Sequence, residues 1–86
     1  MTIPWHYQDD AKAVRKLSVG PMDNNCYVLA CRATAAAVII DAAAEPDRIV
    51  AAVADVKPQA ILTTHGHFDH VGAARVVADQ LAIPFL

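Results

Sequence analysis

The sequence predicts an α/β fold in which three strands are followed by a helix, a fourth strand and a second helix. Short segments at positions 14–19, 26–31, 36–40 and 60–63, of which the last three are mostly apolar, are typical of strands. Apolar residues at helical spacing lie between the last two runs and again after the fourth. The chain has 86 residues, 56% hydrophobic and 19% charged, which fits one globular domain at most and excludes a disordered composition.

The first strand follows a polar lead-in over residues 1–12. The two-residue period of a strand places Val14, Lys16 and Ser18 on one face of residues 14–19 and Arg15, Leu17 and Val19 on the other.

The second and third strands are less polar. A turn-forming segment at residues 20–25, rich in Gly, Pro, Asp and Asn, leads into residues 26–31, which are almost continuously apolar. Residues 32–35 are short enough for a hairpin connection to the third strand, residues 36–40. The composition of this third strand predicts burial on both of its faces.

The two cysteines do not indicate a disulfide framework. Cys26 and Cys31 fall in the same predicted strand and are five positions apart. An odd separation along a strand places the two side chains on opposite faces, so a local bridge is excluded. We expect both to be reduced thiols.

A βαβ unit follows. Pro46 suits the first turn of a helix, and Pro58 cannot continue one. The strands at 36–41 and 60–63 are therefore joined by a crossover long enough for parallel pairing. Parallel neighbours end at the same sheet edge, so Asp41 is expected to point toward the loop that follows the fourth strand.

The second helix is predicted to begin at Val71. Its apolar stripe recurs at positions i, i+3, i+4 and i+7. Those positions are Ala74, Val77, Ala78 and Leu81. Pro84 ends the helix, and the apolar residues 83–86 are typical of the entry to a fifth strand.

The loop between this helix and the preceding strand, His65-Gly66-His67-Phe68-Asp69-His70, is the most informative segment. His65 and His67 are two positions apart, so an extended backbone projects both imidazoles to one side. Asp69 and His70 follow a further bend, so their side chains can reach a second position for a metal close to the first. Nitrogen and oxygen donors in this mixture suit Zn²⁺, and also Fe²⁺ or Mn²⁺.

Two other interpretations of this cluster remain open. A polar loop can be rich in histidine by chance, although three histidines among six residues between a buried strand and a helix are uncommon. A purely structural metal site is the second interpretation. Such sites more often use cysteine and close all four ligand positions, and neither cysteine of the chain is near the cluster.

Charge and hydropathy exclude several classes of partner. The net charge is −2 and the basic residues are scattered, so nothing favours nucleic acid or an anionic membrane surface. No run approaches the ~20 apolar residues of a membrane span. Residues 1–10 lack the apolar core of a signal peptide, and we therefore expect a cytoplasmic protein.

With its flanking residues, the histidine cluster resembles a known signature. Residues 64–72, from Thr64 to Gly72, resemble the His-x-His-x-Asp-His loop of the metallo-β-lactamase superfamily. Residues 25–27 resemble the Asn-x-Tyr strand start of that family, and residues 39–41 resemble its strand that ends in aspartate. The resemblance covers roughly residues 14–86; the loop is highly specific, and the two upstream motifs are weak alone.

The resemblance implies an αβ/βα sandwich built from two similar halves. Residues 1–86 would form a single partial domain, the N-terminal half, with the C-terminal half absent. One local departure concerns the turn after the aspartate strand. Many members have Pro-Gly or Ala-Gly there, whereas this sequence has Ala42 and Ala43, which leaves the shape of the turn open.

The metal ligands implied by the resemblance are incomplete in this chain. His65 and His67 would bind one metal with a third histidine, and Asp69 and His70 would bind a second with a last histidine. A further aspartate would bridge the two metals, so that a complete site holds two Zn²⁺. The three later ligands do not occur, because His70 is the final histidine and Asp79 falls in the second helix. We therefore expect the isolated chain to be inactive.

The implied reaction is hydrolysis of a carbonyl substrate by a hydroxide held between the metals. Asp69 would be catalytic, because it binds one metal and orients the hydroxide. Asp41 would fix a ligand histidine by accepting its free ring N–H, or would serve only as a turn or capping carboxylate. The cluster most resembles the glyoxalase-type branch, whose small-molecule substrates are thioesters of small thiols such as S-acylglutathione.

Other functions compete with this one. A persulfide dioxygenase of the same superfamily carries the same loop but uses one Fe²⁺. A second alternative is that the chain is a non-catalytic fragment that binds metal. A β-lactamase is disfavoured because such enzymes are exported and no export signal is visible, and the RNA-processing branch is disfavoured by the lack of a basic surface.

Overall fold

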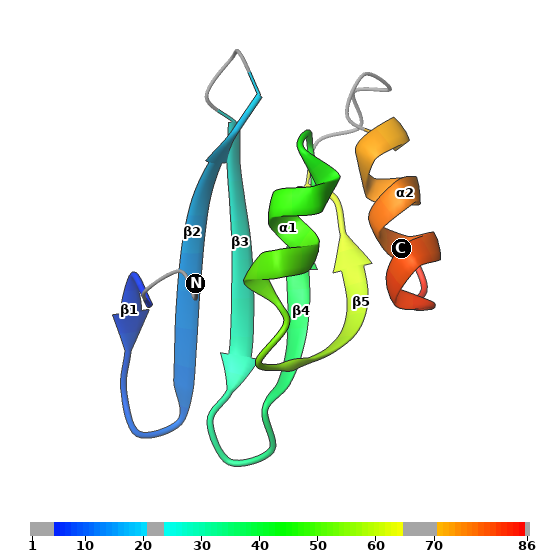
Figure 1. Ribbon diagram of the computed structural model, residues 1–86. Coiled ribbons are helices and arrows are strands. Elements are labelled where there is room, and N and C mark those ends of the chain that lie inside the picture. The colour runs from blue at the N-terminus through cyan, green and yellow to red at the C-terminus, as the bar shows by residue number, and fades with distance from the viewer. Residues whose placement is uncertain (1–4, 21–23, 65–70, 86) are drawn as a thin grey trace.

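The computed structural model describes residues 5–20, 24–64 and 71–85, which form a five-stranded sheet with two helices (Figure 1). The elements are β1 (Tyr7–Gln8), β2 (Lys12–Val19), β3 (Asn24–Cys31), β4 (Ala36–Ile40), α1 (Pro46–Ala52), β5 (Lys57–Leu62) and α2 (Val71–Leu81). The predicted α/β class and element order are confirmed. The short β1, within the lead-in expected to be polar and irregular, was not predicted.

The strands lie in the sheet in chain order, from β1 to β5. The first three pairings are antiparallel, and β4 pairs with β5 in parallel, as the βαβ interpretation requires. Ile40 lies opposite Leu62, so β4 and β5 end at the same edge. The expected fifth strand is reduced to one parallel bridge, between Phe85 and Ile61.

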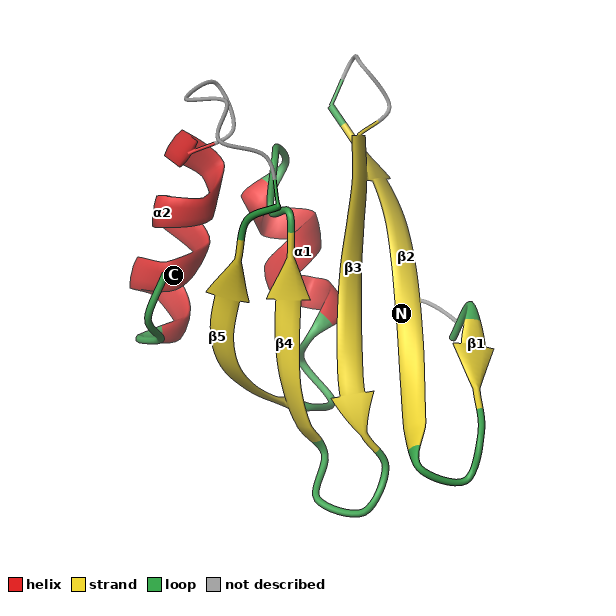
Figure 2. Cartoon of the chain, turned by 180° about the vertical axis from the view of Figure 1, so that it is seen from behind, coloured by secondary structure: helices red, strands yellow, loops and turns green. Residues whose placement is uncertain are grey.

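Both helices cover the same face of the sheet, as Figure 2 shows from the uncovered side. On that covered face the strands present alternate side chains, which pack against the apolar sides of α1 and α2. The core includes Leu17, Val19, Cys26, Val28, Ile39, Ile49, Ala52, Val53, Ile61, Ala74 and Val77. No helix among the described residues is long and apolar enough to cross a membrane.

The prediction that residues 36–40 are buried on both faces is wrong. Ala37 and Ile39 face the helices and are buried, whereas Val38 and Ile40 are only partly buried. The reason is tertiary, because no described segment covers the second face of the sheet. Pairing aligns the side chains of this face in two rows. One row is Leu29, Val38 and Ala60, and the other is Tyr27, Ile40 and Leu62.

The boundary between α1 and β5 also differs from the prediction. α1 ends at Ala52, and the chain continues through Val56 in tighter turns closed by i to i+3 hydrogen bonds. β5 begins at Lys57 and includes Pro58, which was expected only to stop the helix. Proline is tolerated there because the register between β4 and β5 shifts at this point.

The two cysteines lie on opposite faces of β3, as their spacing predicted. Cys26 is buried and Cys31 is exposed, and both are free thiols. Burial, with a smaller effect of the Asp41 charge, raises the pKa of Cys26 to about 12. Hydrogen bonds from the Thr34 side chain, and then from the backbone N–H groups of Thr34 and Ala33, lower the pKa of Cys31.

These environments predict very different thiol reactivities. At pH 8 in native buffer, a disulfide reagent such as DTNB is expected to modify Cys31 quickly, because thiolate is the reactive form. Cys26 is expected to react only after unfolding in denaturant. In the Cys31→Ser variant the fast phase should vanish. Rapid release of two thiolate equivalents from the native protein would contradict the burial of Cys26.

Candidate metal centre

The candidate site lies at the edge where the parallel strands β4 and β5 end. The backbone N–H of Asp41 donates to the carbonyl of Leu62 at 2.9 Å, which extends the pairing one residue beyond β4. Asp41 and Thr64 therefore leave the sheet side by side, as the βαβ unit predicted.

The Asp41 carboxylate fixes the last residue before the histidine cluster. Its Oδ1 accepts the backbone N–H of Thr64 at 2.7 Å, and its Oδ2 accepts the Thr64 hydroxyl at 2.5 Å. Asp41 is thus anchored at the entrance of the loop. Its predicted contact with a ligand histidine stays a prediction.

The predicted ligands His65, His67, Asp69 and His70 lie outside the described residues. Both ends of their loop are placed, by Thr64 after β5 and by Val71 at the start of α2. Elsewhere in the described part of the chain, no three His, Cys, Asp or Glu side chains gather in a group that could hold a metal. Three imidazoles and a carboxylate are a donor set that fits Zn²⁺ or Fe²⁺.

The sequence left open the shape of the turn after β4. In the structure, the residues at its two ends have left-handed backbone conformations. Asp41 and Glu45 have φ values of 59° and 53°. Aspartate tolerates this conformation better than most residues with a side chain. Between them, the N–H of Ala43 donates to the carbonyl of Asp41 at 2.8 Å. Ala42 and Ala43 of this turn are buried in the core.

Glu45 and Arg48 also shape this edge, and sequence reasoning missed both. The Glu45 carboxylate accepts the N–H of Gly20 at 2.7 Å, and this bond is the main cause that lowers the pKa of Glu45. Arg48 donates to the carbonyl of Ser18 at 2.8 Å and contacts Glu45 at 3.1 Å. Together they tie the end of β2 to the start of α1. The sequence did not predict these contacts, because Gly20 and Glu45 are 25 positions apart and Ser18 and Arg48 are 30 positions apart.

The anchoring role of Asp41 can be measured by its effect on stability. Asp41→Ala is expected to lower the free energy of unfolding by about 1–2 kcal/mol, because it removes two hydrogen bonds and places alanine at positive φ. Asp41→Asn is the matched control. Its amide can accept from the Thr64 N–H and donate to the hydroxyl, so urea denaturation should show a smaller loss. Equal losses in the two variants would contradict the role of these contacts.

A family comparison agrees with the geometry of this edge. The family model described as metallo-beta-lactamase superfamily matches residues 19–85. An uncharacterized protein of Aquifex aeolicus is 40% identical over 72 residues, covering 84% of this chain and 34% of the relative. A probable metallo-hydrolase of Bacillus subtilis is 36% identical over 72 residues, covering 81% and 33%. The chain thus spans about a third of the length of these curated relatives.

A third relative is named for its metal. The probable polyketide biosynthesis zinc-dependent hydrolase of Bacillus velezensis is 42% identical over 53 residues, which cover 59% of this chain and 24% of the relative.

Solved structures share the arrangement of strands and helices. The BLEG-1 B3 metallo-beta-lactamase superposes with a TM-score of 0.74 at 35% identity, covering 84% of this chain and 35% of that one. ETHE1 from Myxococcus xanthus gives 0.73 at 28% identity, covering 84% and 33%. TTHA1623 in a di-iron-bound form gives 0.69 at 34% identity, covering 83% and 36%.

Proposed function

The chain belongs to the metallo-beta-lactamase superfamily, and from this premise we propose that it is the N-terminal half of a metal-dependent hydrolase acting on thioesters of small thiols. The observation that carries the proposal is the histidine cluster between β5 and α2, which Asp41 anchors at Thr64. Relatives named as a metallo-hydrolase and a zinc-dependent hydrolase support the reaction class.

The division into halves is part of the proposal. The rows of apolar side chains on the uncovered sheet face are suited to packing against a second sheet about 10 Å away. Leu29 and Leu62 of these rows are 36% and 37% exposed in the chain as described. Such large apolar residues in contiguous rows are typical of a surface that a further part of the same fold covers.

The chemistry is assigned residue by residue. His65 and His67 would hold one divalent metal, and Asp69 and His70 a second. A bound divalent metal supplies acidity to water and polarises a carbonyl oxygen. Asp69 would orient the attacking water toward the carbonyl carbon, and Asp41 would keep a ligand imidazole in one tautomer by accepting its N–H.

Metal identity and the alternative reaction are decided by one experiment. The protein is expressed with the sequence downstream of this chain, and its metal content is measured after loading with Zn²⁺, Fe²⁺ or Mn²⁺. Hydrolysis of S-lactoylglutathione in proportion to Zn²⁺ content is the expected result. The similarity to a di-iron-bound structure keeps iron among the candidates. One equivalent of iron, with oxygen uptake on a persulfide and no thioester hydrolysis, would replace the proposal with the persulfide dioxygenase.

The isolated chain provides the companion test. It is expected to show no turnover of S-lactoylglutathione with added Zn²⁺, because each metal would have only two protein ligands of the three or four it requires. Metal-dependent turnover by the isolated chain would contradict the assignment of the missing ligands.

A further inference from the structure

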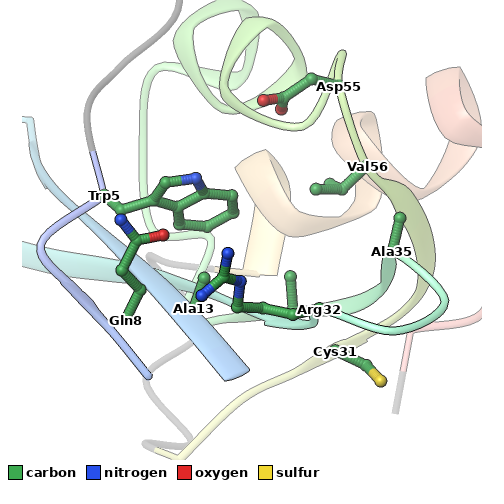
Figure 3. A pocket seen from close by; sticks show the side chains of 9 residues that line it. Trp5, Gln8, Ala13, Cys31, Arg32, Ala35, Asp55 and Val56 are labelled. Carbon is green, nitrogen blue, oxygen red and sulfur yellow. The ribbon is translucent and has the colours of Figure 1, made fainter. Parts of the chain in front are cut away.

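A cavity lies at the end of the sheet away from the candidate metal centre. It has a volume of about 200 Å³ and is bounded by the ends of β2 and β3, the loop before β4 and the segment after α1. Figure 3 shows Trp5, Gln8 and Arg32 around it, with Ala35 and Val56 on another side. The floor is apolar, because Ala13 and Ala30 of the covered sheet face are buried beneath it.

Trp5, the single tryptophan of the chain, is held in place by the sheet beneath it. The guanidinium carbon of Arg15 lies 3.9 Å from the centre of its indole ring, a cation–π contact. Arg15 is 2% exposed and is itself held by Asp55, through hydrogen bonds of 2.5 and 2.7 Å. The indole therefore contributes a fixed, flat side chain to the lining of the cavity.

The polar groups of the cavity carry one unbalanced positive charge. The charge of Asp55, which lines the cavity, is compensated by its ion pair with Arg15. Arg32 donates from Nη1 to the carbonyl of Asp9 at 2.8 Å. Within the described part of the chain, its Nε and Nη2 donors have no partner, and neither has the side-chain amide of Gln8. Nε and Nη2 form the edge of a guanidinium that matches the two oxygens of a carboxylate.

From this arrangement we propose that the cavity binds a small carboxylate with an apolar body. The carboxylate contacts Arg32 and the Gln8 amide, and the apolar body lies against the alanine floor and the indole of Trp5. The volume is below the 300–1,000 Å³ of typical drug-sized sites, so a ligand with a single ring fits. The site is separate from the histidine cluster and does not depend on the proposed hydrolase function.

Tryptophan fluorescence tests the proposal directly, because Trp5 is the only tryptophan in the chain. The chain is titrated with benzoate at pH 7 and constant ionic strength. The expected result is a saturable change in emission, with a dissociation constant on the order of 1 mM for so small a ligand. Benzamide, which has the same ring without the charge, should give no saturable change.

Two variants separate binding at this site from collisional quenching. Arg32→Gln is expected to weaken benzoate binding at least about tenfold, because it removes the charged donor pair. Arg75→Gln makes the same charge change on the exposed side of α2 and should bind as the parent does. Far-UV circular dichroism checks that both variants are folded. No saturable response to benzoate, or equal responses in the parent and Arg32→Gln, would overturn the proposal.

Discussion

His67→Ala, in the protein expressed with its downstream sequence, is expected to remove metal binding and hydrolysis together. His67 is assigned as one of two imidazoles from this chain that hold the same metal, so its loss leaves that metal with too few ligands. Since loss of an outer partner of a ligand alone reduces affinity or activity 10–100-fold, loss of the ligand should cost more than about 100-fold. Metal content by elemental analysis and the initial rate on S-lactoylglutathione are the two measurements.

His6→Ala is the matched control for this prediction. His6 lies beside β1, and its backbone N–H donates to the carbonyl of Val14 at 2.7 Å. Its loss should leave metal content and rate unchanged. If His67→Ala retained the metal and a normal rate, His67 would be excluded from the ligand set.

Asp55→Asn is expected to cause a larger loss of stability than Asp41→Ala. Arg15 is 2% exposed, and its guanidinium depends on Asp55 and on the carbonyl of Ala52 at 2.9 Å. Removing one partner of a fully buried ion pair costs about 3–5 kcal/mol because the other charge stays buried. The Asp55 side chain is 45% exposed, so we expect about 2–3 kcal/mol by urea denaturation at pH 7.

Two further measurements identify the cause of that loss. Asp79→Asn, on the exposed side of α2, should have almost no effect. Arg15→Met in the Asp55→Asn background should recover part of the stability, because it removes the unpaired buried charge. Equal stability of Asp55→Asn and the parent at pH 7 would show that the ion pair contributes nothing.

The same pair makes stability depend on pH. The hydrogen bonds from Arg15 lower the pKa of Asp55 in the folded protein. A carboxyl with a lowered folded pKa contributes stability above its unfolded pKa, which is about 4. That contribution is lost as the pH falls through the lower folded pKa. The stability difference between the parent and Asp55→Asn should therefore be constant above about pH 5 and shrink below pH 4.

Local patterns were sufficient for most of the secondary structure. The two-residue period in residues 14–19 correctly placed Arg15, Leu17 and Val19 on one face of β2, and only the structure shows that this face is the buried one. The apolar residues at helical spacing after Pro46, which include Ile49 and Val53, correctly predicted a helix, and both of these residues lie in the core. Their spacing did not predict that the helix ends at Ala52, because a buried turn with i to i+3 hydrogen bonds continues the same apolar spacing.

Local sequence patterns could not predict the contacts between residues far apart along the chain. The charge of Arg15 was treated as one of several scattered basic residues, whereas its partner Asp55 lies 40 positions away. The contact between Glu45 and Gly20 likewise depends on how α1 meets the end of β2. The spacing of neighbouring residues does not predict such pairs, because they form only when the helices pack against the sheet.

The sequence by itself determined the α/β class, the family and the donor types in the histidine cluster. Periodicity and ligand spacing depend only on residues that are close together along the chain. The tertiary structure alone decided that Asp41 binds Thr64, that Arg15 is buried with Asp55, and that one face of the sheet is uncovered. Burial and pairing depend on which surfaces meet in space, and residues far apart along the chain supply those surfaces.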